Sequence, residues 1–506
     1  MNSIVNQMYT PIAHGGRIHI ENEVILPDYC PDVAKVVKAD IVPRVTSKNI
    51  YSDDSGLNIA ADGTVLFKVI YLAEGSPKLY STFFTENFSH TFKVQADKSS
   101  DFENVFAYIN LTPENVSCRP CASRRMTIKC DISVCPEIRL NRPVEYFTED
   151  ESECELLTQK LSLCSMCGMN EADYNVSEKI ILPRELPPVG EITDCDIRYV
   201  TESLKIANCK AVFNATAYFT CFYDSPEGSI SFCQPIELSQ IIDVPDAEDG
   251  TDGELRFTPT SLRADTDVDN YGENRVITLD FSYTAHAVVF TNREFDAAAD
   301  VFSPTREITA ETGDCNLRRY CQSVYEKVQI PASLRLKNPD ITSFEDIRPT
   351  AYIRGWVAEN GVLTADCRMN IKMIGSYDGG FDGIEENIDF SVHTKLNDIP
   401  SPQCDLSIAV REVDCVPSGS SIEVRADAVL TGSIFSQSSA RFVKTLSVGE
   451  KKKDECRPPI ILYYPSERET LWEIAKKYSL SQSSLRDFNG MESDKITEKV
   501  LKIPMK

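Results

Sequence analysis

The chain has 506 residues, of which 42% are hydrophobic and 25% charged, so its composition is typical of folded domains and excludes a mainly disordered chain. Its formal net charge of -25 at pH 7 argues against nucleic acid or an anionic bilayer as the partner, because both require a basic surface. The start of the chain has no basic segment followed by an apolar run, and no apolar run approaches the ~20 residues that span a bilayer. We therefore expect a cytoplasmic protein without membrane insertion.

A repeated sequence pattern comes first along the chain. Its first marker is VILP at 24–27, IILP at 180–183 and VQIP at 328–331, with separations of 156 and 148 residues. Its second marker begins with Asp-Ile at Asp40, Asp196 and Asp346, with separations of 156 and 150 residues. Because two independent markers recur at nearly the same spacing, we predict three copies of one structural unit. The predicted units are residues 21–150, 174–303 and 320–448.

Each predicted unit contains an alternating strand, a turn and a second alternating strand. The first strands are TVLFKVIYL at 64–72, NATAYFTCFY at 214–223 and ADCRMNIKMIG at 365–375, followed by turns with EGSP, SPEG and YDGG. A later segment places Leu262, Ala264, Thr266 and Val268 on one side of a strand and charged residues on the other. One buried and one wet face is typical of antiparallel sheets. We predict a mainly β fold of three sandwich-like or barrel-like units, with acidic connectors such as Thr148–Glu155.

The composition changes after Val448. Residues 449–459 (GEKKKDECRPP) are charged and proline-terminated, which predicts a linker. The run IILYY at 460–464 predicts a strand. Thr470 and Glu473 have the spacing of a capping box, which predicts the start of a helix. The buried stripe of that helix is predicted to be Leu471, Ile474, Ala475 and Tyr478.

A second short helix and a final strand are predicted to complete this module. Ser481 is a good N-cap, Leu485 and Phe488 are the apolar residues that would face the core, and Asn489-Gly490 favours a left-handed stop. The run VLKIP at 500–504 can pair with IILYY. The predicted domain, residues 460–506, is therefore a small βααβ fold.

This βααβ pattern resembles the LysM module. The residues that carry the resemblance are TLWEIAKKY, the spaced LRDFNG and the terminal LKIP. The resemblance implies binding of N-acetylglucosamine-containing glycans in a shallow groove between the loops Ser466–Thr470 and Asn489–Ser493. The candidate residues for binding a glycan or a protein partner are Arg468, Glu469, Thr470, Trp472, Asn489, Gly490 and Met491.

Two departures from the LysM pattern favour a protein partner over a sugar. Arg468-Glu469 stands where the family usually has Gly-Asp, and Glu498 stands where a glycine is common. Because glycine lets the backbone approach a ligand closely, a bulky charged residue narrows a site for a neutral sugar. Trp472 lies off the predicted buried stripe, so it either anchors an exposed interface or shields the flank of the module's own core.

Three strand-rich units followed by a LysM module resemble the spore-coat morphogenesis proteins of anaerobic spore-forming bacteria. The resemblance implies a non-enzymatic scaffold in the mother-cell cytoplasm, at the forespore surface. The terminal module would then bind the coat's basement-layer ATPase, and the β units would contact other coat proteins. The alternatives are a peptidoglycan- or cortex-binding protein and a lytic cell-wall enzyme with a LysM targeting tail.

Residues with the potential for chemistry are few. The pairs Cys118/Cys121 and Cys164/Cys167 have the spacing of zinc ligands, but 42 residues separate them, so we expect buried structural cysteines and no metal. The acidic stretches at 246–254 and 265–273 do not fit a calcium-binding EF-hand loop. The five histidines are scattered, and there is no phosphate-binding GxxxxGK[ST] loop. We expect neither catalysis nor a cofactor.

Overall fold

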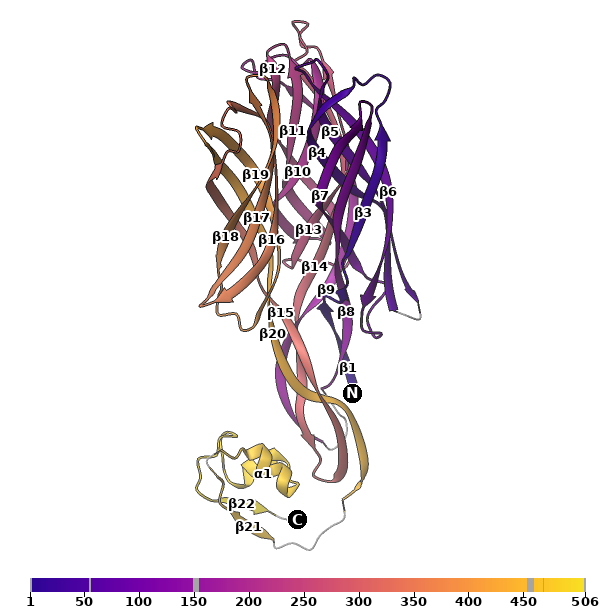
Figure 1. Ribbon diagram of the computed structural model, residues 1–506. Coiled ribbons are helices and arrows are strands. Elements are labelled where there is room, and N and C mark those ends of the chain that lie inside the picture. The colour runs from indigo at the N-terminus through magenta and orange to yellow at the C-terminus, as the bar shows by residue number, and fades with distance from the viewer. Residues whose placement is uncertain (1, 54–55, 149–153, 453–458, 467, 505–506) are drawn as a thin grey trace.

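The computed structural model describes residues 2–53, 56–148, 154–452, 459–466 and 468–504. The chain is mainly β, as predicted, and places three strand-rich units side by side above a narrow stem (Figure 1). The small C-terminal domain lies at the far end of the stem (Figure 1). In the described part of the chain, no helix has the length and apolar character needed to cross a membrane.

Each unit is built on two antiparallel sheets with equivalent strand order. The sheets of the second and third units have three strands each, and each sheet of the first unit has a fourth strand near the N-terminus of the chain. The first unit contains β3 (Gly16–Ile25), β4 (Val33–Asp53), β5 (Gly56–Ala73), β6 (Leu79–Gln95), β7 (Phe106–Ala122) and β8 (Arg125–Phe147). The second contains β9 (Glu155–Ile181), β10 (Glu191–Ala207), β11 (Lys210–Ser225), β12 (Gly228–Asp243), β13 (Asp252–Asp267) and β14 (Val276–Phe302). The third contains β15 (Arg306–Arg335), β16 (Ser343–Glu359), β17 (Val362–Tyr377), β18 (Gly380–Lys395), β19 (Pro402–Ser418) and β20 (Ser421–Lys451).

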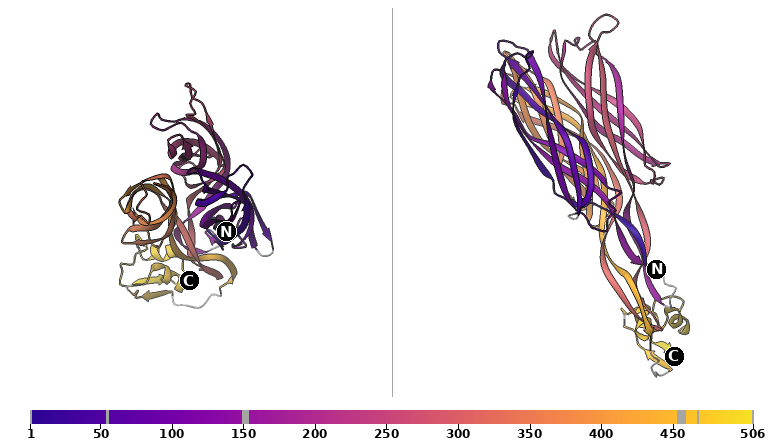
Figure 2. Two further views of the ribbon diagram at one scale, coloured as in Figure 1. Left: turned by 45° about the horizontal axis from the view of Figure 1, so that its top comes forward. Right: turned by 90° about the vertical axis from the view of Figure 1, so that its right-hand side faces the viewer.

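The three predicted alternating strands are the central strands β5, β11 and β17 of equivalent sheets. One face of each packs into the core of its own unit. The other face carries Ile70, Phe222 and Ile374, which are spaced by 152 residues in both steps and meet in one buried cluster. The units therefore pack through equivalent positions around a shared axis (Figure 2). A central strand covered on both faces must be apolar on both faces.

The stem is built from the ends of the longest strands. Strand β1 (Asn2–Tyr9) pairs with β8, β9 pairs with β14, and β15 pairs with β20, which gives three antiparallel ribbons. Their inward side chains form a common buried cluster of Val144, Leu163, Phe295, Ala297, Leu317 and Phe442. Because each ribbon contributes to this cluster, the three units are joined by a continuous hydrophobic core and not only by their connectors.

The strands of the stem extend into the segments that the sequence pattern places between the units. Residues 174 and 320, the predicted starts of units two and three, lie inside β9 and β15, because these strands run through both the stem and a unit. Of the predicted connector Thr148–Glu155, residues 149–153 lie outside the described residues, and Glu155 begins β9. Of the predicted linker 449–459, the first three residues belong to β20, and residues 453–458 lie outside the described residues.

One detail of the predicted alternation is wrong. Leu262 and Ala264 pack against the core of the second unit, as expected. Thr266 is exposed, and Val268 is 55% exposed. Thr266 is the last residue but one of β13, and Val268 follows the end of this strand at Asp267, so both lie at the margin of the sheet.

Charged side chains are buried or partly buried where the three units meet. Their contacts are Lys38 Nζ to Asp346 Oδ2 at 2.7 Å, Arg348 Nε to Asp346 Oδ1 at 2.8 Å, Lys68 Nζ to Asp194 Oδ1 at 2.8 Å and Lys372 Nζ to Asp40 Oδ1 at 2.9 Å. Lys38, Lys68 and Asp40 belong to the first unit, Asp194 to the second, and the others to the third. Each carboxylate is matched by a cation, so burial leaves no carboxylate uncompensated.

This network predicts a loss of stability in acid. Burial acts to raise the pKa of Asp194, but Lys68 and Arg348 outweigh it and hold the pKa at about 2. Because the carboxyl has a higher pKa in the unfolded chain, its stabilising contribution is complete above about pH 5 and is lost as the pH falls toward 2. We expect a loss of about 2 kcal/mol from this group, measured by urea unfolding at pH 5 and pH 2. Asp194→Asn should start less stable but show a smaller loss between the two pH values, and an unchanged loss would contradict this account.

Candidate functional site: the C-terminal two-helix module

The C-terminal module has the predicted order of elements. Strand β21 (Ile460–Tyr463) is followed by α1 (Leu471–Tyr478), α2 (Gln482–Phe488) and β22 (Leu501–Pro504). The two strands pair antiparallel, with Ile461 opposite Ile503 and Tyr463 opposite Leu501. The predicted pairing of the run at 460–464 with the run at 500–504 is confirmed (Figure 1).

Local sequence signals fix both helix starts. The N–H of Glu473 donates to Thr470 Oγ1 at 3.2 Å, and the N–H of Thr470 donates to Glu473 Oε2 at 2.8 Å, so the capping box is complete. Ser481 Oγ accepts a hydrogen bond from the N–H of Ser484 at 3.1 Å. Gly490 has a φ of 64°, which confirms the predicted left-handed stop after α2.

The predicted helical stripe forms the module's core. Leu471, Ile474 and Ala475 are buried together with Leu485, Leu501 and Ile503, and Tyr478 packs against them. The burial predicted for Phe488 is wrong, because its side chain is 47% exposed at the last residue of α2. Leu485 and Met491 instead fill the space beside α1.

The loop before α1 is held by Glu469. Its Oε1 accepts a hydrogen bond from the hydroxyl of Tyr463 at 2.5 Å, and its Oε2 accepts one from the N–H of Ser466 at 3.2 Å. The Tyr463 hydrogen bond also lowers the pKa of Glu469. Arg468 and Thr470 are exposed. Glu469 therefore shapes the loop, and its neighbours Arg468 and Thr470 are presented to solvent.

The loop after α2 is held by Asn489. Its Nδ2 donates to the carbonyl oxygens of Leu485 and Lys502 at 2.9 and 2.8 Å, and its Oδ1 accepts from the N–H of Lys502 at 2.7 Å. This side chain clamps α2 to β22 and uses its hydrogen-bonding groups inside the module. Met491 is only 9% exposed, whereas Gly490 is exposed and has open space around it.

Trp472 lies in an interface that joins the module to the stem. It is only 5% exposed, so the alternative in which it is exposed is wrong. Its ring packs on Phe302 of β14, with the ring centroids 4.9 Å apart and the planes at 68°. Its Nε1 donates to Asp300 Oδ2 at 2.8 Å. The sequence pattern could not show this contact, because the partner residues precede Trp472 by about 170 positions.

Lys476, one helical turn after Trp472, completes the same interface. Its Nζ lies 2.6 and 2.7 Å from the two carboxylate oxygens of Asp300. Burial acts to raise the pKa of Asp300, but the bonds from Lys476 and Trp472 outweigh it and lower the pKa. Lys452 adds a bond from its Nζ to Ser479 Oγ at 2.9 Å. The stem thus binds the flank of α1, and the solvent-facing residues Arg468, Thr470 and Gly490 take no part in these bonds.

The structure separates the two Cys-x-x-Cys pairs. Cys118 and Cys121 lie on β7 of the first unit, whereas Cys164 and Cys167 lie on β9. Burial raises the pKa of both Cys118 and Cys164 to about 12, which disfavours the thiolate that a metal requires. Among the described residues, no group of three or more His, Cys, Asp or Glu side chains is placed to hold a metal ion.

The module consists of two capped helices packed on a two-stranded antiparallel sheet. The LysM domain family model matches residues 466–504, so the chain carries a C-terminal LysM domain. No curated protein and no solved structure shows a significant match to the chain.

Proposed function

We propose that this protein is a non-catalytic scaffold whose C-terminal LysM domain binds N-acetylglucosamine-containing glycan, such as peptidoglycan. The observation that carries the proposal is the LysM match at residues 466–504. The bonds that hold this domain to the stem come from Trp472 and Lys476, and the described loop residues, which exclude Glu467, take no part in them. The three β units and the stem then act as an elongated body that carries the domain at one end (Figure 2).

The exposed residues of the two loops suit a neutral, polar ligand. Arg468 supplies hydrogen-bond donors and Thr470 a hydroxyl group, while Gly490 lets a ligand approach the backbone because it has no side chain. Tyr464 and Phe488 border the two loops and are 71% and 47% exposed, so each offers an apolar ring face beside polar groups. A shallow site of this kind recognises a sugar through a few polar contacts and one or two apolar faces.

Glycan binding predicts that retention on insoluble peptidoglycan depends on the LysM domain. We expect the full chain to cosediment with peptidoglycan, and a chain that ends at Lys451 to lose at least about tenfold in retention. A soluble N-acetylglucosamine oligomer should release the full chain, which controls for nonspecific adhesion. Equal sedimentation of the two chains would contradict the proposal.

A second candidate function is the docking of a coat protein, as the resemblance to spore-coat morphogenesis proteins implies. It is favoured by Ile460, Leu462 and Tyr464, which alternate along β21 and its end and are 51%, 60% and 71% exposed. An apolar row on the outer face of a small sheet is typical of protein interfaces. Under this candidate, the protein acts in the mother-cell cytoplasm at the forespore surface and binds the coat's basement-layer ATPase.

The two candidates predict different effects of Leu462→Asp. If the outer face of β21 docks a protein, this variant should capture less partner from a lysate of sporulating cells and still bind peptidoglycan. If the loops bind glycan alone, the variant should behave like the parent protein in both assays.

A further inference from the structure

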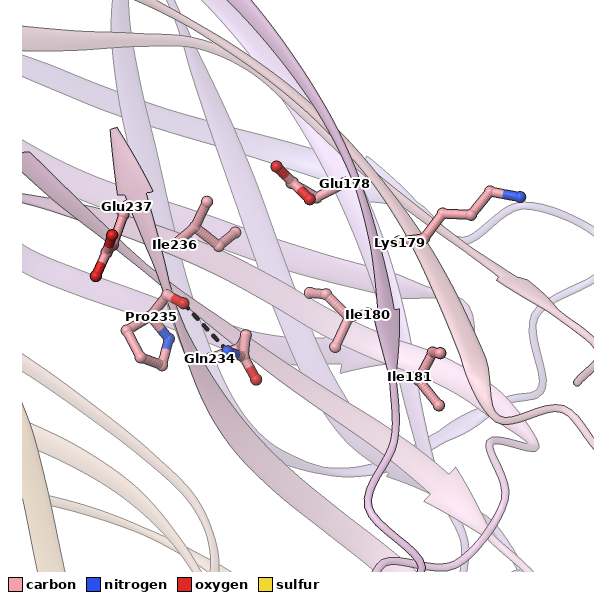
Figure 3. Close-up of a pocket in the computed structure, with 8 residues that line it drawn as sticks. All are labelled: Glu178, Lys179, Ile180, Ile181, Gln234, Pro235, Ile236 and Glu237. Carbon is pink, nitrogen blue, oxygen red and sulfur yellow. Dashed lines mark hydrogen bonds between the residues drawn. The ribbon is translucent and has the colours of Figure 1, made fainter. Parts of the chain in front are cut away.

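The second β unit has an open slot between the edges of its two sheets. Strands β9 and β12 are edge strands of their respective sheets, and no described strand pairs with the free edge of either. Residues 178–181 and 234–237 line the slot, which has a volume of about 430 Å³ (Figure 3). Strand β12, which forms one side of the slot, lies in the upper body at the opposite end from the LysM domain (Figure 1).

Alternate residues of β12 direct their backbone groups into the slot. The carbonyl oxygens of Ile241 and Asp243 accept hydrogen bonds from Tyr174 and Asn170 of β9, at 2.8 and 2.7 Å. Pro235 is in the same phase of the strand, where its lack of an N–H removes no hydrogen bond to β11. The pairing of β11 with β12 runs without a bulge, so Glu237 is in this phase too. Its N–H and C=O therefore face the slot, where no described strand pairs with them.

The first unit shows that such an edge accepts an additional strand. There the equivalent edge strand is β6, and the short strand β2 (Ile12–Ala13) pairs with it antiparallel, opposite Gln95 and Val94. In the second unit, hydrogen bonds from Tyr174 and Asn170 bridge the two edges near one end, and the pocket lies around Glu237.

We propose that the slot between β9 and β12 binds an extended segment of a partner protein by β-strand addition. Main-chain hydrogen bonds to the edges would give affinity, and alternate side chains would give specificity. The apolar contacts are Ile180 and Ile236 at the floor and Ile181, which is 74% exposed. Each lining strand contributes four residues, so the bound stretch is about 13 Å long, or about four residues.

The charge of the slot specifies the partner further. Glu178 and Glu237 line it against one cation, Lys179, and the whole chain carries a net charge of -25. The acidic lining and the negative net charge both favour a basic partner, so we expect a segment in which apolar residues alternate with lysine or arginine. This surface belongs to the β body, and the inference does not depend on what the LysM domain binds.

The test compares two substitutions of Glu237 that remove the same charge. The probe is a fluorescent peptide of sequence Lys-Val-Lys-Ile-Lys-Val, titrated with the full-length protein and followed by anisotropy. Glu237→Pro also removes the N–H that faces the slot, whereas Glu237→Ala keeps it. We expect saturable binding that Glu237→Pro weakens about tenfold relative to Glu237→Ala. Ser239→Pro, in the same phase, should repeat the effect, and circular dichroism identifies any variant that fails to fold.

Several outcomes would overturn the proposal. Absence of saturable binding would contradict it. Equal affinity of the proline and alanine variants would also contradict it, because the binding would then reflect only attraction between a basic peptide and an acidic protein. Equal binding of a matched peptide with glutamate in place of lysine would contradict the charge argument. Self-association of the protein that Glu237→Pro abolishes would assign the slot to a second copy of this chain instead.

Discussion

Asp346→Ala is expected to lower the free energy of unfolding by about 3–5 kcal/mol. Asp346 is 0% exposed, and its two oxygens contact Lys38 of the first unit and Arg348 of the third. Removing the carboxylate leaves both cations buried without their nearest counter-charge. The cost is therefore the desolvation of two charges, in addition to the loss of two hydrogen bonds.

Chemical denaturation at neutral pH measures this effect. Asp378→Ala is the matched control, because Asp378 is an exposed aspartate of the same unit, and it should change the stability by less than about 0.5 kcal/mol. Since the network joins the three units, the parent protein should unfold its β body in one transition. Equal midpoints for Asp346→Ala and the control would show that the network does not stabilise the contact between units.

Asp300→Ala is expected to release the LysM domain from the stem. Asp300 accepts the indole N–H of Trp472 and pairs with Lys476, so its removal deletes the polar contacts that hold α1 against β14. Hydrogen bonds to a charged group contribute about 2 kcal/mol, and the half-exposed ion pair adds little. Trp472 is 5% exposed, and the other tryptophan, Trp356, is 37% exposed. Release should therefore shift the fluorescence to longer wavelength and make it easier to quench with acrylamide.

Two further variants separate the contribution of the Trp472 hydrogen bond from that of the Lys476 ion pair. Asp300→Asn keeps an acceptor for Trp472 but loses the charge that pairs with Lys476, so its effect should be intermediate. Asp296→Ala changes an exposed carboxylate on the same strand and should leave the emission unchanged. If Asp300→Ala shows the emission and quenching of the parent protein, then Phe302 packing and the Lys452–Ser479 bond hold the domain on the stem without Asp300.

The sequence predicted those features that depend on local signals. The recurring proline and Asp-Ile markers indicated three copies of one β unit, because each copy must satisfy the same turns and strand starts. Thr470, Glu473 and Ser481 predicted the helix starts, since a cap is satisfied within three residues of the helix. The buried stripe of α1 followed from helical periodicity alone.

Features built from distant segments could not be predicted in this way. Trp472 is buried by Phe302 and Asp300, and the stem core joins residues from three separate ribbons. One available signal is the pair of apolar faces on each central strand: Phe222 faces away from the core of its own unit yet is 0% exposed. A strand that is apolar on both faces indicates a second covering surface.

Some binding residues also required the structure. Glu469 and Asn489 were candidates for contact with a ligand, but their side chains hold the two groove loops in place. The sequence signal for the slot in the second unit is Pro235, which lies inside strand β12. A proline there indicates that its position faces an unpaired edge.

The central claim is that the LysM domain of the intact protein binds N-acetylglucosamine glycan, and calorimetric titration of the full-length chain with an N-acetylglucosamine tetramer tests it most directly. We predict saturable heat with one site per chain, retained in Asp300→Ala and absent from a chain that ends at Lys451. Titration without saturable heat at millimolar tetramer, or equal heat from the chain that lacks the domain, would contradict the claim.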